Sequence, residues 1–241
     1  MIKFFRKIRF DLMGKNNTSK YLKYAIGEVV LVVVGILIAL SISNWNENRK
    51  LTNTMKSVYS IIQNDLLSDI DVIEKVLVSS QIRDTIFKKV IDKKITYEDY
   101  LKCNLCIRIL GGYPDIKLKT KGLKLLEQNS TILNSYQNTL SININDFYSY
   151  FTTEIGVALQ EVDLDYIENR SYFKNNMAWF EDYENGKMNE EFIKYALTSF
   201  DYRNRVISFY SLYYDSYLKY LREYKKEAIK LIAKINKEIK E

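Results

Sequence analysis

The chain has 241 residues, no histidine and a formal net charge of +6. Without histidine it can build neither a Ser-His-Asp nor a Cys-His nucleophile system, so acid–base chemistry would depend on carboxylates, lysine or tyrosine. One proline and eight glycines argue against a loop-rich β fold, and we expect an all-α fold of long helices. We predict no catalytic residue, no metal ligand and no cofactor.

The positive charge is concentrated at the N-terminus. Residues 1–23 hold seven Lys or Arg residues and one acid, Asp11, and the rest of the chain is about neutral. The basic balance therefore indicates an anionic membrane leaflet and not nucleic acid as the partner. The apolar residues of 2–13 share one helical face, which predicts an interfacial helix, with a docking peptide for a cytoplasmic partner as the alternative.

Residues 24–43 form the one long apolar run, with Glu28 as its only charged residue. A helix needs about 20 mostly apolar residues to cross the lipid bilayer, and this run has that length. More cations lie before the run than directly after it. The N-terminus is therefore expected in the cytoplasm and the bulk of the chain on the far side of the membrane. The aromatic residues expected at the two membrane interfaces are Tyr21, Tyr24 and Trp45.

Two features of the run leave alternatives open. Residues 39–41, Ala-Leu-Ser, resemble a signal-peptide cleavage site, but the run is longer than a signal core, which favours an uncleaved anchor. Glu28, Gly35 and Ala39 lie on one helical stripe, and small residues four apart allow two helices to approach closely. This stripe predicts a helix–helix contact within the membrane, whereas a shallow Glu28 that reaches the headgroups is the alternative.

The N-terminal sequence resembles a known signature. MIKFFRKIR followed by KYAIGEVVLVVVGILIALSISNWNENRK is similar to the start of an uncharacterised family of bacterial single-span membrane proteins, with a basic N-terminus, a YAIGE-type span and an NNW-type exit. Residues 119–126 resemble the K-x-x-G-x-L segment of that family. The resemblance implies a bacterial inner-membrane protein with a periplasmic C-terminal domain, and it implies no activity.

Apolar residues at helical spacing predict the elements that follow the span. We expect a helix over about 46–91 that continues the span, short helices over 97–110 and 121–128, a long helix from near Ser130, a helix over 190–200 and a final helix to about 239. The expected N-caps are Thr96, Thr120 and Asn189, and Asp201 caps or interrupts the final helix. These elements predict a transmembrane helix that continues into an elongated antiparallel helical bundle.

The predicted organisation has three parts: a cytoplasmic segment (1–23), a transmembrane helix (24–43) and an exported bundle domain (44–241). Three groups in the bundle could carry chemistry, and for each we favour a structural role. Cys103 and Cys106 form a C-x-x-C pair without a βαβ context, which predicts a structural pair or a disulfide. Asp163, Asp165 and Glu168 form a carboxylate cluster that could hold a cation, but their spacing matches no calcium loop and favours a solvated helix face. The third group, a tyrosine-rich band over 209–224, reads as core more readily than as a ligand pocket.

We therefore expect a membrane-anchored periplasmic interaction or sensing module without catalytic activity. Its expected partners are the lipid bilayer and a second protein or another copy of the chain, through the span or the bundle. The alternative is a membrane-tethered enzyme that uses carboxylates near the distal end of the bundle. A cleft with paired acids of shifted pKa would favour the enzyme.

Overall fold

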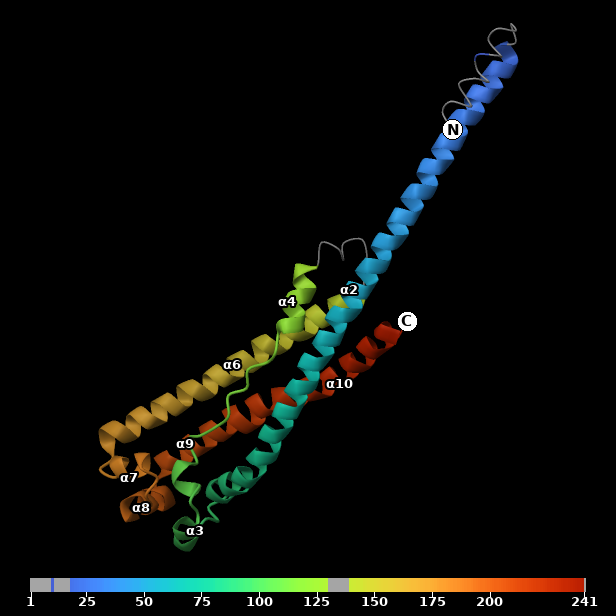
Figure 1. Cartoon of the computed structure of the whole chain (residues 1–241). Coiled ribbons are helices and arrows are strands. Elements are labelled where there is room, and N and C mark those ends of the chain that lie inside the picture. The colour runs from blue at the N-terminus through green and yellow to red at the C-terminus, as the bar shows by residue number, and fades with distance from the viewer. Residues whose placement is uncertain (1–9, 11–17, 130–138, 241) are drawn as a thin grey trace. The chain divides into compact units, whose positions relative to one another are not determined.

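The computed structural model describes residue 10, residues 18–129 and residues 139–240, and all regular elements in these ranges are helices (Figure 1). The predicted all-α class is therefore confirmed. The chain divides into two compact units, Met1–Met55 and Lys56–Glu241, and helix α2 (Thr18–Ile91) contributes to both. The predicted interfacial helix over 2–13 and the helix start near Ser130 lie outside the described residues.

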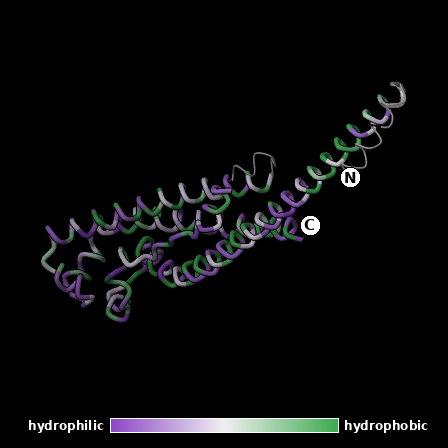
Figure 2. The backbone as a smooth tube through the Cα atoms, turned by 45° about the horizontal axis from the view of Figure 1, so that its top comes forward, coloured by the Kyte–Doolittle hydropathy of each residue, from purple (hydrophilic) through white to green (hydrophobic). Residues whose placement is uncertain are grey.

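Helix α2 has two different kinds of surface along its length. In the first unit, its large apolar side chains between Val29 and Ile42 are all exposed, and Figure 2 shows this part as a continuous hydrophobic run. In the second unit, one stripe of the same helix is buried, beginning at Val58, Tyr59 and Ile62. The helix predicted over 46–91 is confirmed as part of α2.

The chain then returns along α2 in an extended segment. After α3 (Tyr97–Lys102) and the 3-10 turn η1 (Cys106–Arg108), the carbonyl of Gly112 accepts a hydrogen bond from Arg83. Further on, the N–H of Lys119 donates to Asp69 at 3.2 Å, and the N–H of Gly122 donates to Asp65 at 2.7 Å. Residues 112–122 thus run backwards along α2, and α4 (Lys121–Gln128) begins beside its earlier turns.

This return lets α6 (Thr139–Asn176) run in the same direction as α2. Ser141, near the start of α6, contacts Tyr59, whereas Asp163, near its end, accepts a hydrogen bond from Tyr113 in the loop that follows η1. The short helices α7 (Phe180–Glu184), α8 (Glu190–Thr198) and α9 (Phe200–Tyr210) gather with α3 at one end of this unit (Figure 1).

The π-helix η2 (Ser211–Tyr217) and α10 (Leu218–Lys240) continue α9 and run antiparallel to α2. Their contacts with α2 move to earlier residues of that helix as the chain proceeds. Tyr210 donates to Asp84, Tyr224 to Asp69, and Asn236 accepts from Gln63. The predicted bundle is therefore present, with α6 parallel to α2 and the C-terminal helices antiparallel to both.

Several predicted helix ends were correct and others were wrong. Thr96 forms a capping box with Asp99, and Asn189 caps α8, as predicted. The helix predicted over 97–110 stops at Lys102, because the backbone turns at Cys103, which pairs with Cys106. The bounds of α4 are as predicted, but Thr120 makes no side-chain cap, and the N–H of Gly122 at this helix start donates to Asp65 of α2 instead.

The last correction concerns the start of the C-terminal helices. The hydroxyl of Ser199, not the carboxylate of Asp201, caps α9, and it accepts hydrogen bonds from the N–H groups of Asp201 and Tyr202. Asp201 instead accepts a hydrogen bond from Tyr195 and pairs with Arg205 at 3.1 Å. Its carboxylate is therefore engaged by side chains on either side of the helix junction.

Candidate functional site

The apolar part of α2 is the first candidate, since its side chains have no protein to pack against. Its apolar window is long enough to cross a membrane and none of it is buried. Burying a Val, Leu or Ile side chain gains about 1.5–3 kcal/mol over leaving it in water. A run of eleven such exposed side chains between Val29 and Ile42 is therefore unstable in water and suited to lipid.

The residues predicted to act in the membrane lie on this same segment. Tyr24 and Trp45 are exposed at its two ends, and the guanidinium of Arg49 lies 5.8 Å from the Trp45 ring centre. The side chain of Tyr21 lies outside the described part. Gly35 and Ala39 are exposed, and a Cβ added at Gly35 would meet no atom within 4 Å. The contact between spans through Glu28, Gly35 and Ala39 stays a prediction.

The second candidate is the tyrosine-rich band, which the structure places in the core. Its hydroxyls form a ladder of hydrogen bonds that join the C-terminal helices to the rest of the second unit. Tyr213 and Tyr214 contact Ser80 of α2 at 3.0 and 2.9 Å through its hydroxyl and its carbonyl. Tyr217 donates to the carbonyl of Pro114 at 3.3 Å. We call Tyr210, Tyr213, Tyr214, Tyr217 and Tyr224 the tyrosine ladder.

The π-helix explains how the ladder fits against α2. Buried residues recur every fourth position through this stretch, at Phe209, Tyr213, Tyr217 and Leu221, and a second row follows at Tyr214 and Leu218. A π-helix has i→i+5 hydrogen bonds and a wider turn, so a spacing of four keeps residues on one face. The four-residue spacing is visible in the sequence, but we predicted an ordinary α-helix here and missed the π-helix.

A small cleft opens beside the ladder. It has a volume of about 170 Å³ and combines Ser80, Asp84 and Lys88 of α2 with Tyr210, Tyr214 and Arg222 of the C-terminal helices. Lys88 and Asp84 pair at 2.6 Å, and Tyr210 donates to the same carboxylate at 2.9 Å. The charged groups at this cleft therefore pair largely with one another.

The third candidate is a pair of buried acids on α2, which sequence reasoning missed. Asp65 is 8 % and Asp69 is 2 % exposed. Asp65 accepts the Gly122 N–H at 2.7 Å, while Asp69 accepts the Lys119 N–H and, at 2.7 Å, the Tyr224 hydroxyl. A signal existed, since both acids lie at the helical spacing of the buried residues Ile62, Leu66 and Ile73.

These acids hold structure and do not meet the requirements of an active site. Burial raises the pKa of Asp69, while the hydrogen bonds from Tyr224 and Lys119 lower it in part. Such a paired, shifted carboxylate could serve as a general acid if a substrate reached it. Both carboxylates are closed off from solvent, and backbone N–H groups occupy their oxygens. They anchor the return segment to α2.

The distal end of the second unit holds the fourth candidate. Arg83 of α2 donates to the carbonyls of Arg108, Ile109, Gly111 and Gly112, at 3.4, 2.8, 2.5 and 2.5 Å. Burial lowers the pKa of this guanidinium. Gly112 has φ +66, and a Cβ at Gly111 would lie 3.0 Å from the Tyr166 ring. Only glycines therefore let this loop wrap the arginine and meet α6.

A cleft of about 270 Å³ lies beside this loop, lined by Arg108, Gly111, Gly112, Tyr166, Tyr183 and Glu184. Arg108 donates to the Glu184 carbonyl at 2.5 Å, and Arg170 holds the Glu184 carboxylate with two hydrogen bonds of 3.1 and 3.0 Å. Burial raises the pKa of Tyr183, which keeps its hydroxyl neutral. The lining offers a cation and two phenols to a small polar or anionic ligand, and it places no nucleophile beside a general base.

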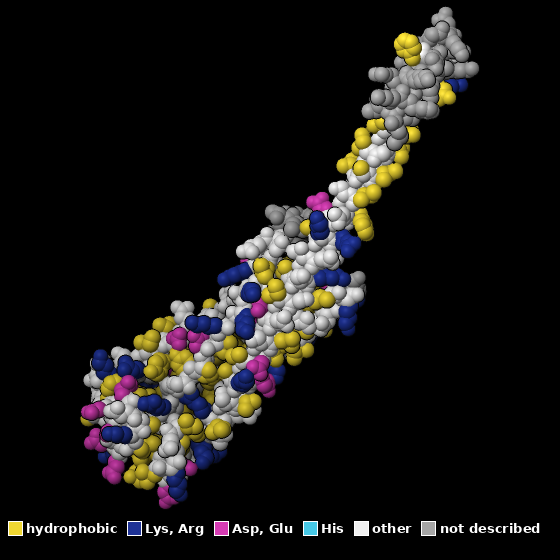
Figure 3. Space-filling view, in the orientation of Figure 1, with side chains coloured by type: hydrophobic (Ala, Val, Ile, Leu, Met, Phe, Trp, Pro, Cys, Tyr) yellow, Lys and Arg dark blue, Asp and Glu magenta, His cyan; other side chains and the backbone are white. Residues whose placement is uncertain are grey.

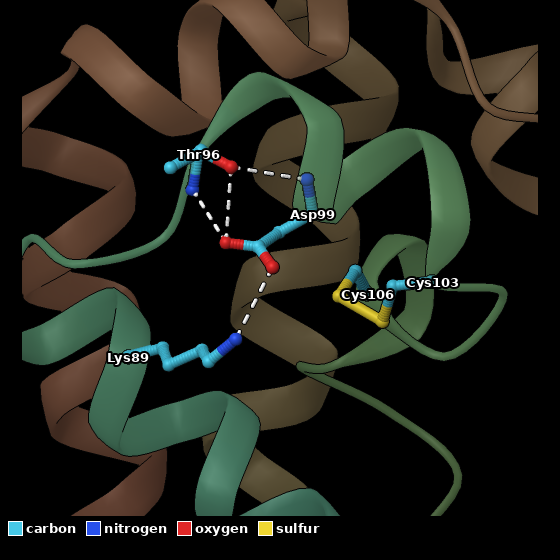
Figure 4. The surroundings of a disulfide bond; sticks show 5 residues. All are labelled: Lys89, Thr96, Asp99, Cys103 and Cys106. Carbon is cyan, nitrogen blue, oxygen red and sulfur yellow. Dashed lines mark hydrogen bonds and ion pairs between the residues drawn. A yellow bond between two sulfur atoms is a disulfide. The ribbon is translucent and has the colours of Figure 1, made fainter.

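The two cysteines form a disulfide near α3, Cys103–Cys106 (Figure 4). Figure 4 also shows the capping box of Thr96 and Asp99, with Lys89 of α2 reaching Asp99 at 3.1 Å. The hydrogen bonds from Thr96 and Lys89 lower the pKa of Asp99. The disulfide and the capping box thus hold the short α3 in place.

The acidic group on α6 does not come together as a cation site. Asp163 accepts a hydrogen bond from Tyr113, and Asp165 accepts from Ser208 and Asn169, both at 2.7 Å. Glu168 lies 3.8 Å from Arg205. Within the described ranges, no three His, Cys, Asp or Glu side chains gather as a metal site requires.

The comparison with protein families gives one match. A model described as a family of unknown function (DUF6090) matches residues 28–111, which is less than half of the chain. The match agrees with the expectation of an uncharacterised family. It extends from Glu28 to the loop that Arg83 binds, and so covers most of α2, α3 and the disulfide. No curated protein and no solved structure matches the chain.

Proposed function

We propose that the protein is a single-span bacterial inner-membrane protein whose second unit is a periplasmic module for interaction or sensing. The N-terminus is cytoplasmic in this proposal, in line with the excess of cations before the span. The module binds a partner, and the span fixes its position or passes on a small helix shift.

The observation that carries this proposal is the nature of α2. The helix Thr18–Ile91 combines an apolar, wholly exposed segment with a stripe that forms part of the core of the second unit. Lipid accounts for the first part and intramolecular packing for the second.

The buried acids of α2 give no support to the enzyme alternative, which places its carboxylates near the distal end of the bundle. Asp69, whose pKa burial raises, lies one helical turn from Asp65, but the protein's own N–H and hydroxyl groups occupy both carboxylates. A binding module needs accessible surfaces instead, and the second unit has these in the distal cleft and on its exposed helix faces.

Alkaline extraction of membranes tests the anchor. The full chain should remain in the membrane pellet, and a Val33→Lys, Ile36→Lys double variant should be released, because two cations at mid-span oppose insertion. A matched Leu67→Lys, Ile229→Lys variant places the same charges on exposed positions of the second unit and should stay in the pellet. Release of the wild-type chain by alkali would refute the proposal.

A further inference from the structure

Helix α6 has a second, partly apolar face that the described part of the fold leaves exposed. Its first face is buried in the core, with residues such as Ile144, Tyr148, Phe151, Ile155 and Val162. On the opposite side, seven uncharged residues are all exposed. We call them the α6 seam: Tyr150, Thr153, Val157, Gln160, Leu164, Ile167 and Ser171. Hydrophobic side chains also lie between the charged ones on the surface shown in Figure 3.

The spacing of the seam is that of a coiled coil. Its residues follow one another at alternating steps of three and four, which is the 3.5-residue repeat that keeps a seam facing a partner helix. The seam spans three heptads, or about 32 Å at 1.5 Å per residue. Its largest members are well exposed: Leu164 and Ile167 are each 59 % exposed, Val157 is 50 % and Tyr150 is 49 %. Single exposed apolar residues are common, but four of the seven seam positions are apolar and share one face, which is typical of an interaction surface.

Charge along one edge of the seam defines the partner. Glu154, Glu161 and Glu168 each follow a seam residue by four positions and so line the same edge. Glu161 and Glu168 are exposed, Glu154 interacts with Tyr220, and Glu168 also lies 3.8 Å from Arg205 of its own chain. In coiled coils, residues at this edge pair with charged residues of the partner helix and decide which partner binds.

The row of glutamates along this edge argues against a second copy of this chain as the partner. In an antiparallel pair of α6 helices the glutamates would face each other. In a parallel pair they would face Ser149, Gly156 and Asp163 of the other copy, so no cation would meet them. An anionic membrane surface is disfavoured for the same reason, because it would approach a row of carboxylates.

We propose that the α6 seam is the docking site for an amphipathic helix of a partner protein, with apolar residues at a 3.5-residue repeat and Lys or Arg along the edge that meets Glu154, Glu161 and Glu168. This deepens the proposed function by naming the class of partner, and it rests on the second unit being an interaction module. The distal cleft and the ladder cleft take no part in it.

Synthetic three-heptad helical peptides test the proposal with the full chain in detergent. Two peptides share Leu and Ile at the seam positions and carry either Lys or Glu along both edges, and fluorescence anisotropy measures their binding. The Lys peptide should bind at least about tenfold more tightly than the Glu peptide. A Leu164→Asp variant should weaken binding by about tenfold or more, whereas Ile229→Asp, at a similarly exposed position of α10, should not change it.

Charge reversal sharpens the test. The double variant Glu161→Lys, Glu168→Lys should transfer the preference to the Glu peptide, and the control Glu181→Lys, Glu190→Lys should retain the wild-type preference. Circular dichroism checks that each variant is folded. A photo-crosslinking residue at position 164, which adds no charge, replaces Leu164→Asp if that variant does not fold.

Three outcomes in detergent would overturn the proposal: equal binding of both peptides, binding that Leu164→Asp leaves unchanged, or self-association of the chain that Leu164→Asp abolishes. In intact cells, a crosslinker at position 157 or 164 should capture a basic amphipathic helix of another protein, and capture of a second copy would overturn the proposal. Peptide binding in detergent does not depend on membrane insertion, so its failure and the failure of the alkaline-extraction test are separate results.

Discussion

The hydroxyl of Tyr224 donates a 2.7 Å hydrogen bond to the carboxylate of Asp69, across 155 residues of sequence. The same carboxylate receives the N–H of Lys119, so one acid of α2 joins the return segment and α10. Both side chains are buried. The contact therefore connects three parts of the second unit at one point.

Tyr224→Phe should destabilise the protein. It takes a hydrogen-bond partner from a buried carboxyl group, and leaving such a group short of a partner costs about 1–3 kcal/mol. Urea denaturation should show this loss. Tyr97→Phe, at an exposed tyrosine, is the control and should change the free energy of unfolding by less than about 0.5 kcal/mol. Equal effects of the two variants would contradict the role of this hydrogen bond.

Asp69 should make stability depend on pH in a defined direction. Burial raises its pKa above the ordinary value of 3.8, so the folded chain holds this proton at a pH where the unfolded chain has lost it. The contribution of this group to stability therefore increases as the pH falls toward 3.8 and decreases as the pH rises through the raised pKa.

The comparison with Asp69→Asn isolates this group. The wild type should gain stability relative to Asp69→Asn when urea unfolding is measured from about pH 7 down to about pH 4.5. Asp71→Asn, at an exposed acid paired with Lys75, should follow the wild type. A stability difference between wild type and Asp69→Asn that stays constant over this range would show that the Asp69 pKa is not raised.

Two glycine-to-alanine substitutions should have opposite signs. At Gly122, a Cβ would lie 2.5 Å from Cγ1 and 2.7 Å from the backbone nitrogen of Ile62, so α4 must move away from α2. We expect a loss of about 1–3 kcal/mol. Gly156, in the middle of α6, has nothing within 4 Å, and alanine there should stabilise by about 1 kcal/mol. Thermal unfolding of both variants measures the contrast, and a tolerated Gly122→Ala would mean that α4 is not tightly packed on α2.

The disulfide should report the compartment of the second unit. A Cys103–Cys106 bond persists in an oxidising compartment and is rare in the cytoplasm. Thiol labelling of the chain from intact cells should find no free thiol unless a reductant is added first. Replacing both cysteines with serine should cost about 2 kcal/mol or less, because the bond closes a short loop. Labelling without reductant would indicate that this unit is cytoplasmic.

Fusion reporters test the orientation independently of the cysteines. A reporter that is active only outside the cytoplasm should be active when fused after Glu241, because cations before the span outnumber those after it. A reporter that is active only in the cytoplasm should be inactive at the same position. The reverse pattern would refute the proposed orientation.

Features set by neighbouring residues were predictable from the sequence. Thr96 and Asn189 cap their helices because each side chain bonds to N–H groups two or three residues ahead. The continuous α2 followed from uninterrupted helical spacing without proline or glycine after the span. In each case the information lies within a few turns of chain.

Features set by distant partners were not predictable in this way. The start of α4 bonds to Asp65 rather than to Thr120, and nothing near Thr120 in the sequence reveals that partner. Arg83 looked like any charged residue of an amphipathic helix, although four carbonyls between Arg108 and Gly112 surround it. The return segment, residues 112–122, has no helical or strand pattern in its sequence. Its direction depends on these long-range contacts with α2.

The π-helix has a consequence for how the chain tolerates changes of length. An i→i+5 turn contains one residue more than an i→i+4 turn, so deletion of the exposed Asp215 can convert η2 to α-helix while α9 and α10 keep their alignment with α2. Deletion of the exposed Lys226 cannot be absorbed in this way, because α10 has no π-helical turn to convert. It would rotate Ala228, Leu231 and Ile235 by about 100° away from the core. Insertions and deletions between relatives of this protein should therefore accumulate within residues 211–217 and be excluded from α10.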